Sequence, residues 1–253
     1  MKIIIGNTGL VGKTVCESIT FDQEYNTTNI GNFFEHSKDG DELFLTCLPA
    51  TKWMVNKNLG NDLSNINQLI NRIARNHYSK ITLISTIDVY NDSPLKSNEN
   101  YAPNVGKLSY GNNRYLFELM VRELVKTDDL KIFRLPALFN KHIKKNVLFD
   151  LINENNIEQI NGNSSFQWYN LDNLTSDIEK YSSRYPNETV FNLFTEPIDT
   201  MEIVKLFPQY VDRVSHSDIK VKYDYTTKHN EYISSKETVL EEIKNLIHEL
   251  SIK

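Results

Sequence analysis

The sequence holds little of what marks secreted or membrane proteins. Only two of its 253 residues are cysteines, Cys16 and Cys47. Each falls in an apolar run, so we expect reduced, buried thiols and no disulfide framework. No apolar stretch approaches the ~20 residues that a membrane-spanning helix needs. The N-terminus MKIIIG has neither a long apolar region nor a small-residue cleavage site. These absences predict a cytoplasmic protein without a membrane partner.

An excess of positive charge is also missing. The formal net charge is −5 and the sequence pI is about 5.7. Lysine and arginine are scattered, and their one dense group, at residues 141–145, is short. Because a nucleic-acid partner requires a basic face or stripe, we expect none. The six histidines show neither i, i+4 pairing nor cysteine companions, so we expect no metal site.

Glycine is scarce, yet the first dozen residues contain Gly6, Gly9 and Gly12. They follow a short β-branched run at 2–5, which predicts a buried strand, and precede a predicted helix at 10–20. A glycine at 6 permits a tight turn, Gly9 lets backbone approach a pyrophosphate, and Gly12 lets the helix pack close to the strand. The helix N-terminus adds free N–H groups and a partial positive charge. This turn predicts a dinucleotide site at Gly6, Thr8, Gly9, Leu10, Val11 and Gly12.

Strands and helices then alternate through the first 135 residues. Apolar runs and spacing predict strands at 24–28, 42–48, 80–86 and 131–135, and helices at 62–76 and 109–126. The alternation predicts an α/β fold with a Rossmann-type, doubly wound parallel sheet. Residues 29–41 are too few for a helix, a strand and a helix. One unit of the usual sheet should therefore be shortened or missing.

The alternation of strands and helices ends after Pro136. We expect a polar helix at 141–163, short strands at 166–169, 190–193 and 219–223, and helices at 201–207 and 235–250. The length allows one domain or two. The pattern favours a dinucleotide-binding domain at 1–138 and a smaller substrate-binding region at 139–253. That region should cap the carboxyl edge of the sheet, where ligands of such sheets bind, and pack back on the sheet in part.

The cofactor is less defined than its turn. After the second predicted strand come Thr27, Thr28, Asn29 and Asn32. None is a carboxylate for a ribose diol or an arginine for a 2′-phosphate, so NAD and NADP stay open. Asn29 is still predicted to border the cofactor. So are Leu48 and Pro49, because they follow a strand at the same edge of the sheet.

Several further motifs carry a family resemblance. They are Ser85-Thr86-Ile87-Asp88-Val89-Tyr90, Tyr110-Gly-Asn-Asn-Arg114, Phe133-Arg134-Leu135-Pro136, Trp168 to Leu174 and Phe191-Asn192-Leu193. With the glycine pattern, and in this order, the chain resembles the extended short-chain dehydrogenases/reductases over nearly its whole length. The resemblance implies an NAD- or NADP-dependent oxidoreductase or epimerase acting on a nucleotide-activated sugar. It makes Thr86, Tyr110 and Arg114 catalytic, gives the last two a cofactor contact as well, and allows a homodimer.

The residue chemistry agrees with this assignment. Hydride transfer at a carbinol needs a proton donor or acceptor beside the carbon. A tyrosine serves if a cation lowers its pKa from ~10. Tyr110 and Arg114 stand four residues apart and so share a helix face, while Thr86 ends a strand and can orient the substrate oxygen. The alternative for Tyr110 is a tyrosine at a helix start with its hydroxyl in solvent.

One departure from the family pattern leaves the activity open. Arg114 stands where the family has lysine, and the arginine fork is larger and planar. The consequences include a working variant, a slow enzyme, or a dinucleotide-binding sensor or structural member of the same fold. Tyr232-Ile-Ser-Ser-Lys236 also matches the literal Tyr-x-x-x-Lys pattern. It lies beyond the predicted sheet strands, so we assign it no catalytic role.

Three more residues have two interpretations each. In the family's 4,6-dehydratases two acidic residues follow the threonine, but here Ile87 precedes Asp88, which favours a reductase or epimerase. Asp88 either faces the substrate or forms a turn. Lys52 either faces a phosphate or is solvated, and Trp53 packs either on a ligand ring or in the core.

Overall fold

The structure, a computed structural model, describes residues 1–33 and 37–251. Its residues group into two compact units. The first contains Met1–Pro94, Tyr101–Arg134 and Asn173–Asn192, and the second contains Leu95–Asn100, Leu135–Asp172 and the chain from Leu193 onward. The boundary at residue 138 stays a prediction, and one segment beyond it, Asn173–Asn192, belongs to the unit that holds the main sheet.

A six-stranded sheet forms the centre of the first unit, in the order β11-β7-β5-β3-β1-β2. The strands are β1 (Lys2–Ile5), β2 (Gln23–Tyr25), β3 (Glu42–Leu45), β5 (Lys80–Thr86), β7 (Leu130–Leu135) and β11 (Val190–Asn192). The registers of β1 with β2 and β3, of β3 with β5 and of β7 with β11 are parallel. Ile3, Ile4 and Ile5 are all buried, as expected for a strand covered on both faces.

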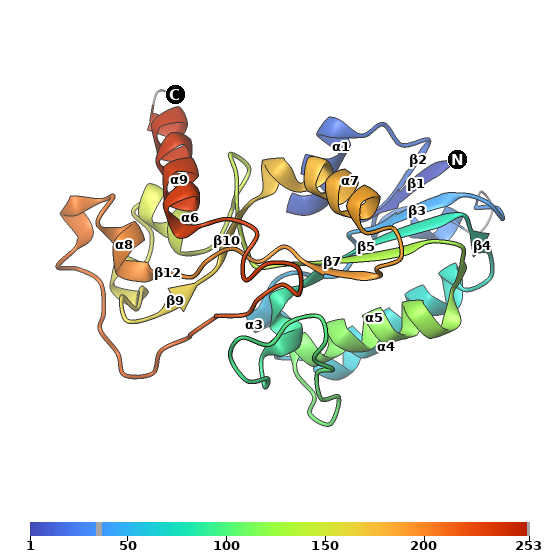
Figure 1. Ribbon diagram of the computed structural model, residues 1–253, viewed down its shortest axis with the longest axis horizontal. Coiled ribbons are helices and arrows are strands. Elements are labelled where there is room, and N and C mark those ends of the chain that lie inside the picture. Colours follow the sequence, from blue (N-terminus) through green and yellow to red (C-terminus); the bar gives the residue numbers. More distant parts are fainter. Residues whose placement is uncertain (34–36, 252–253) are drawn as a thin grey trace. The chain divides into compact units, whose positions relative to one another are not determined.

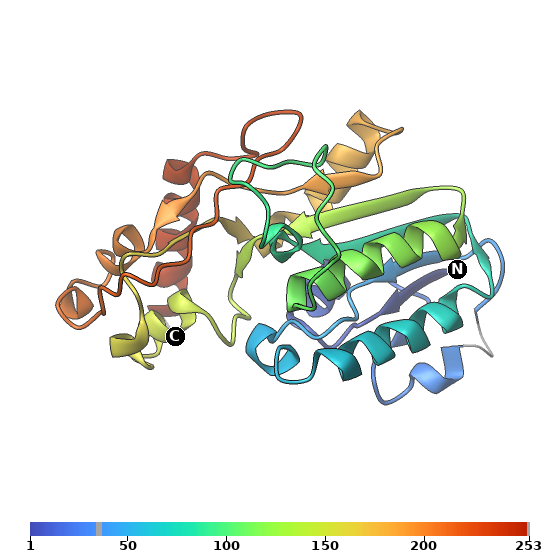
Figure 2. The same cartoon turned by 90° about the horizontal axis from the view of Figure 1, so that it is seen from below.

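Helices cover both faces of this sheet (Figure 1). Helices α1 (Leu10–Ser18) and α7 (Leu174–Arg184) lie on one face, and α4 (Leu59–Ile73) and α5 (Tyr110–Leu124) lie on the other. Figure 2 shows α4 and α5 side by side across the strands. A short parallel ladder of β4 (His77–Tyr78) and β6 (Lys126–Thr127) completes the unit. The predicted doubly wound α/β fold is confirmed.

The predicted shortening of the sheet is confirmed at its β2 edge. In the described residues between β2 and β3, the chain adds no further strand to the sheet and forms a short 3-10 helix, η1 (Ile30–Asn32). Strand β2 is therefore the edge strand, whereas the usual order continues with one more strand.

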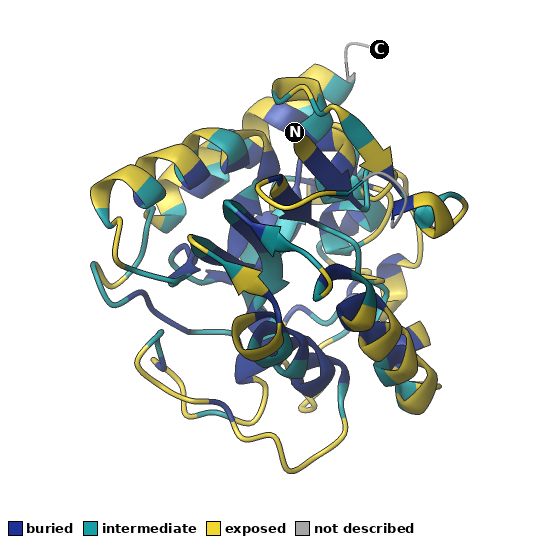
Figure 3. Cartoon of the chain, turned by 90° about the vertical axis from the view of Figure 1, so that its right-hand side faces the viewer, coloured by how far each residue is buried: buried dark blue, intermediate teal, exposed yellow. Residues whose placement is uncertain are grey.

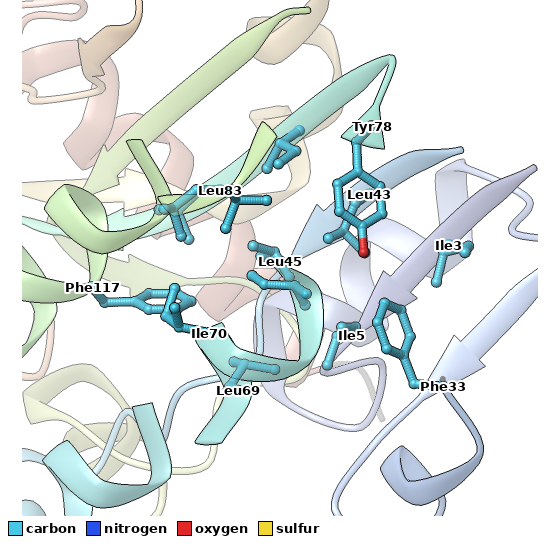
Figure 4. Close-up of a cluster of buried hydrophobic side chains, with 14 of the residues drawn as sticks. Ile3, Ile5, Phe33, Leu43, Leu45, Leu69, Ile70, Tyr78, Leu83 and Phe117 are labelled. Carbon is cyan, nitrogen blue, oxygen red and sulfur yellow. The ribbon is translucent and has the colours of Figure 1, made fainter. Parts of the chain in front are cut away.

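The core of the first unit joins the sheet to α4 and α5. Figure 4 shows strand residues Ile3, Ile5, Leu43, Leu45 and Leu83 facing Leu69, Ile70 and Phe117 of the helices. The helical residues recur at the spacing of one buried face. Figure 3 shows that the exposed residues of the helices lie on their outward faces.

The second unit contains short elements. Strand β8 (Ala137–Phe139) pairs in parallel with β10 (Trp168–Asn170), and β9 (Ser165–Phe166) pairs antiparallel with β12 (Ile198–Asp199). Its helices are α6 (Val147–Ile152), α8 (Thr200–Val204), α9 (Lys236–Ser251) and the 3-10 turns η3 (Ile157–Gln159), η4 (Leu171–Asn173) and η5 (Pro208–Tyr210). Helix α9 packs beside β10.

Two predicted elements of this unit are wrong. The helix predicted at 141–163 is reduced to α6, because Asn146, Glu154 and Asn156 all have positive φ, which an α-helix does not accept. The strand predicted at 219–223 is a single bridge between Lys222 and Ser165, and Ile219 is 90% exposed. Ile219 and Val221 are therefore exposed, and only Tyr223 of that run packs on a strand, through its ring on Phe166 of β9.

The literal Tyr-x-x-x-Lys match near the C-terminus does not form a pair. The Tyr232 hydroxyl donates to Asp224 at 2.6 Å and contacts the Lys96 ammonium. Lys236 instead pairs with Glu202 at 3.2 Å. Tyr232 thus helps to hold the segment Leu95–Asn100 within the second unit.

Candidate active site

The glycine turn after β1 has no room for side chains at two of its positions. Gly6 has φ of +106°, and a Cβ there would lie 2.6 Å from the Thr46 carbonyl carbon. A Cβ at Gly12 would lie 2.1 Å from the Gly6 carbonyl oxygen. At Gly9 the nearest atom would be 3.7 Å away. Gly6 and Gly12 are therefore required by the fold, while the open face of Gly9 leaves space for a ligand.

Helix α1 begins directly after Gly9. Gly9 is extended, no side chain caps the helix, and its first turn contains no acidic residue. Such an N-terminus presents backbone N–H groups and a partial positive charge to an anion. Thr8 is exposed, and Leu10 and Val11 are half-buried. The predicted residues fit the pyrophosphate of a dinucleotide.

The end of β2 contains a carboxylate that the sequence analysis did not find. Strand β2 ends at Tyr25, earlier than predicted, and the Asn7 amide donates to Glu24 at 2.7 Å. Asn26, the next residue, also contacts Asn7, at 3.3 Å. The predicted Asn29 accepts from the Asn26 N–H at 2.7 Å and donates to the Glu24 carbonyl at 3.0 Å. Glu24 is thus the acidic group beside the turn, and Asn29 shapes the loop behind it.

The segment after β3 has both packing and polar contacts. Leu48 packs against the core cluster, and the Pro49 carbonyl accepts from Arg114 at 2.8 Å.

Burial raises the pKa of the Cys47 thiol to about 12, and the pKa of the Cys16 thiol is raised by burial too. Both cysteines are free and partly buried, as predicted.

Tyr110 and Arg114 open helix α5 and face each other. Ser109 caps the helix by accepting from the Asn112 N–H. The Arg114 guanidinium lies 4.4 Å from the centre of the Tyr110 ring, and both residues are buried. Arg114 also donates to both oxygens of Asp62 on α4, at 2.8 and 3.1 Å. The predicted pair therefore exists, with a third member that was not predicted.

The pKa of Tyr110 differs from the expectation. Burial raises the pKa of the phenol above its ordinary value. Arg114 opposes the rise through its charge and a hydrogen bond, but the charges of Asp88 and Asp62 add to it. Arg114 thus acts on the pKa of Tyr110 in the predicted direction, but in the protein alone burial and two carboxylates outweigh it.

Thr86 and Asp88 stand at the carboxyl end of β5, at the start of the 3-10 helix η2 (Ile87–Tyr90). The Thr86 hydroxyl accepts from the Asp88 N–H at 3.2 Å. Asp88 accepts from Lys52, the first residue of the short helix α3 (Lys52–Val55), at 2.7 Å. Trp53 is 63% exposed with Lys57 over its ring, so it is no core residue.

Gly111 brings Tyr110 to this strand end. A Cβ at Gly111 would lie 1.8 Å from the Asp88 carbonyl oxygen, so α5 can approach η2 only through a glycine. The sequence analysis missed Gly111, Asp62 and Glu24. Gly111 could have been found, because a glycine in the first turn of a predicted helix is unusual. Glu24 could have been found from its spacing of about 20 residues from the glycine turn. Asp62 carried no local signal.

A second buried network lies on the same helix. Arg134 of β7 donates to both oxygens of Glu118 on α5, the shortest contact being 2.6 Å. Its other end donates to the Tyr90 hydroxyl at 2.5 Å, and the Asn192 amide donates to that hydroxyl at 3.1 Å. Burial alone would lower the pKa of Arg134, but Glu118 holds it above its ordinary value. Tyr90 thereby fixes η2 to the strands beneath it.

Comparisons with known proteins agree with this arrangement at the level of the fold. No protein-family model matches the sequence, and no curated protein matches it. MoeE5 in complex with UDP-glucose and NAD aligns with a TM-score of 0.75 at 13% identity, over 100% of this chain and 99% of that one.

A reductase and an epimerase align over similar lengths. The dTDP-4-dehydrorhamnose reductase of Yersinia enterocolitica gives a TM-score of 0.71 at 10% identity, over 98% of each chain. The UDP-N-acetylglucosamine 4-epimerase of Bacillus cereus gives 0.70 at 14% identity, over 99% of each.

The chain has the extended short-chain dehydrogenase/reductase fold. The fold that the motifs predicted is thus confirmed. Within it, Thr86, Asp88 and Tyr110 bring an alcohol, a carboxylate and a phenol to one end of the parallel sheet. Such groups can orient an oxygen and move a proton to or from it.

Two further features concern the described residues. In residues 1–33 and 37–251, no helix is long and apolar enough to cross a membrane. The same part of the chain holds no group of three or more His, Cys, Asp or Glu side chains that could bind a metal ion. His36 lies outside the described residues.

Proposed function

We propose that the chain is an NAD(P)-dependent oxidoreductase or epimerase that acts on a nucleotide-activated sugar, with Tyr110 as its acid/base. The observation that carries the proposal is the meeting of α5 and η2 at Gly111. It brings Tyr110 to the strand end that holds Thr86 and Asp88. MoeE5 was solved with UDP-glucose and NAD, and the other two matched structures are an epimerase and a reductase of nucleotide sugars. The ligands of MoeE5 and the nucleotide sugars in the names of the other two support the choice of substrate class.

The proton step is assigned to Tyr110. A bound nicotinamide cofactor supplies or accepts the hydride. In reduction the Tyr110 phenol donates its proton to the substrate oxygen, and in oxidation it accepts that proton back. Thr86 orients the oxygen through its hydroxyl. Arg114 acts on Tyr110 from the next turn of α5, at 4.4 Å from the ring.

The cofactor is assigned to the glycine turn from Gly6 to Gly12. Its ribose would meet the end of β2, where the polar groups beside Asn7 are the Glu24 carboxylate and the Asn26 amide. A carboxylate accepts hydrogen bonds from a ribose diol and repels a 2′-phosphate. We therefore favour NAD over NADP.

The experiment is a pair of measurements on the purified chain. A thermal shift with NADH and with NADPH tests the cofactor, since a ligand at about 100 times its Kd stabilises a fold by ~3 kcal/mol. Turnover of a panel of UDP- and dTDP-sugars, followed by nicotinamide absorbance and by product analysis, tests the reaction. Binding of neither dinucleotide would overturn the proposal.

A second candidate function is dinucleotide binding without turnover. The observation that favours it is the engagement of Arg114 by Asp62 and Pro49. It predicts a thermal shift with NADH and no conversion of any member of the panel. The first candidate predicts the thermal shift and also the conversion of at least one member of the panel.

A further inference from the structure

Three hydrogen bonds hold the Arg114 guanidinium in place within the first unit. Its Nη1 donates to Asp62 at 2.8 Å, and its Nη2 donates to Asp62 at 3.1 Å and to the Pro49 carbonyl at 2.8 Å. The side chains of Arg114 and Asp62 are 5% and 6% exposed. The guanidinium is therefore fixed at three points within the first unit, and its remaining open face covers the Tyr110 ring.

The Asp62 carboxylate is likewise held by several hydrogen bonds. Besides Arg114, its carboxylate accepts from the Asn113 amide at 2.9 Å, and that amide also donates to the Leu59 carbonyl at 3.1 Å. Asn113 is fully buried. Helix α4 thus offers one carboxylate, and the first turns of α5 bind it through two successive side chains. A bidentate arginine–carboxylate pair of this kind defines orientation as well as distance.

From these contacts we infer that Asp62 is a positioning residue for Tyr110. It holds the Arg114 guanidinium over the phenol ring and offsets its positive charge there. The inference rests on the proposed role of Tyr110 as acid/base. It gives Arg114 a task that differs from binding a ribose, and it explains how arginine can stand four residues after the tyrosine. A lysine ammonium has no planar fork to pair with Asp62 in this way.

The charges around Tyr110 come from three elements. Arg114 lies on α5, Asp62 on α4 and Asp88 on η2, where Asp88 is itself paired with Lys52 of α3. Asp62 and Asp88 disfavour the phenolate, and Arg114 favours it. Removing one charge from the Asp62–Arg114 pair should therefore shift the titration of Tyr110 in a direction that depends on which charge is removed.

The experiment is an NMR titration of the full chain with tyrosine isotope-labelled at the ring Cζ. The Tyr110 resonance is assigned from its loss in Tyr110→Phe. We expect Asp62→Asn to lower the pH at which Tyr110 titrates, by about one unit or more. Arg114→Met should raise it, and the variant that combines both changes should titrate between the two. Circular dichroism checks that each variant is folded.

The opposite signs separate positioning from simple loss of packing. A loosened helix would expose Tyr110 and move its titration in the same direction in both single variants. Asp41→Asn is the matched control, since it removes another buried carboxylate of the first unit, one that pairs with the N-terminal ammonium at 3.0 Å, and should leave the titration of Tyr110 unchanged. The inference is overturned if Asp62→Asn leaves the titration of Tyr110 unchanged or raises it. Equal shifts in Asp41→Asn and Asp62→Asn would overturn it as well.

The titration needs neither cofactor nor substrate, so its outcome is independent of the proposed function. A chain that binds no dinucleotide, yet shows opposite shifts in the two variants, would refute the function and keep the positioning. A chain that converts a nucleotide sugar, yet shows no shift in Asp62→Asn, would support the proposed function and refute the positioning role of Asp62. Where turnover is found, the pH profile of kcat/KM in Asp62→Asn should move with the titration of Tyr110.

Discussion

Two tyrosines of the first unit have neighbours of the same residue types but differ in their contacts with them. Tyr110 lies beside the Arg114–Asp62 pair, and Tyr90 lies beside Arg134, which pairs with Glu118. In both cases a buried carboxylate holds an arginine near a tyrosine ring, at 4.4 Å for Tyr110 and 5.0 Å for Tyr90.

The hydroxyls make the difference. The Tyr90 hydroxyl accepts from Arg134 at 2.5 Å and from Asn192 at 3.1 Å, so it is part of a closed network. Arg114 instead directs its short hydrogen bonds to Asp62 and Pro49. The same side-chain types thus build a structural anchor at Tyr90 and surround the proposed acid/base at Tyr110. A motif of residue types cannot tell these apart, but the direction of the arginine can.

The largest expected effect separates the two tyrosines by activity. Tyr110→Phe removes the proton donor and should lower turnover of a nucleotide sugar by about 10²- to 10⁴-fold, with the affinity for NADH kept. Tyr90→Phe removes a hydroxyl from the buried network and should mainly lower stability. Steady-state kinetics and NADH titration of both variants measure this. Equal losses of turnover would break the comparison.

The next effect concerns the structural network. Glu118→Gln leaves Arg134 buried without its counter-charge, and breaking such a pair costs about 3–5 kcal/mol. Urea unfolding followed by circular dichroism gives the change in the free energy of unfolding. A cost below about 1 kcal/mol would mean that the network is not what fixes η2.

The glycine turn offers a comparison of the same kind. Gly12→Ala places a Cβ 2.1 Å from the Gly6 oxygen and should destabilise the chain by about 1–3 kcal/mol. Gly9→Ala has space for its Cβ in the protein alone. It should keep the stability and weaken dinucleotide binding. Thermal melts with and without NADH test both, and a stability loss in Gly9→Ala as large as in Gly12→Ala would contradict the assignment.

The pH dependence follows from the raised pKa of Tyr110. Because burial raises that pKa, the phenol stays protonated below it and can donate throughout the neutral range. Reduction should therefore be insensitive to pH near neutrality. Oxidation needs the phenolate and should speed up about tenfold per pH unit on approach to the pKa. Rates in both directions between pH 6 and about 9 decide this, and a falling oxidation rate would contradict it.

The smallest effect is on cofactor choice. Glu24→Gln removes the negative charge beside Asn7 and should narrow the preference for NADH over NADPH by about two- to fivefold, the size of an exposed charge interaction. Competition binding of the two cofactors measures the ratio. A native preference for NADPH would show that Glu24 does not face the ribose.

These comparisons also show what the sequence could predict. The roles of Gly6 and Gly12 followed from local backbone geometry, so their positions in the chain were sufficient. Tyr110 and Arg114 were implied by the family resemblance, and their spacing of four residues, about one helical turn, placed them on one helix face. The helix at 141–163 was wrong because Asn146 and Asn156 have positive φ, a backbone property that hydrophobic periodicity does not encode.

Local sequence patterns could not predict which side chains from distant segments contact the site. Asp62 is 52 residues from Arg114 and reads as one polar position at the start of α4. Only the packing of α4 against α5 brings it to the guanidinium. Glu24 was missed for a smaller reason. The end of the strand was placed three residues too late, because the side chains of Asn26 and Asn29 bind the backbone and turn the chain away.

The most direct test of the account is the turnover of a nucleotide-sugar panel by the native chain and by Tyr110→Phe, with NADH binding measured on the same samples. The account predicts that the native chain converts at least one member, and that Tyr110→Phe binds NADH equally well and converts none at a comparable rate. Conversion at the native rate by Tyr110→Phe would contradict it.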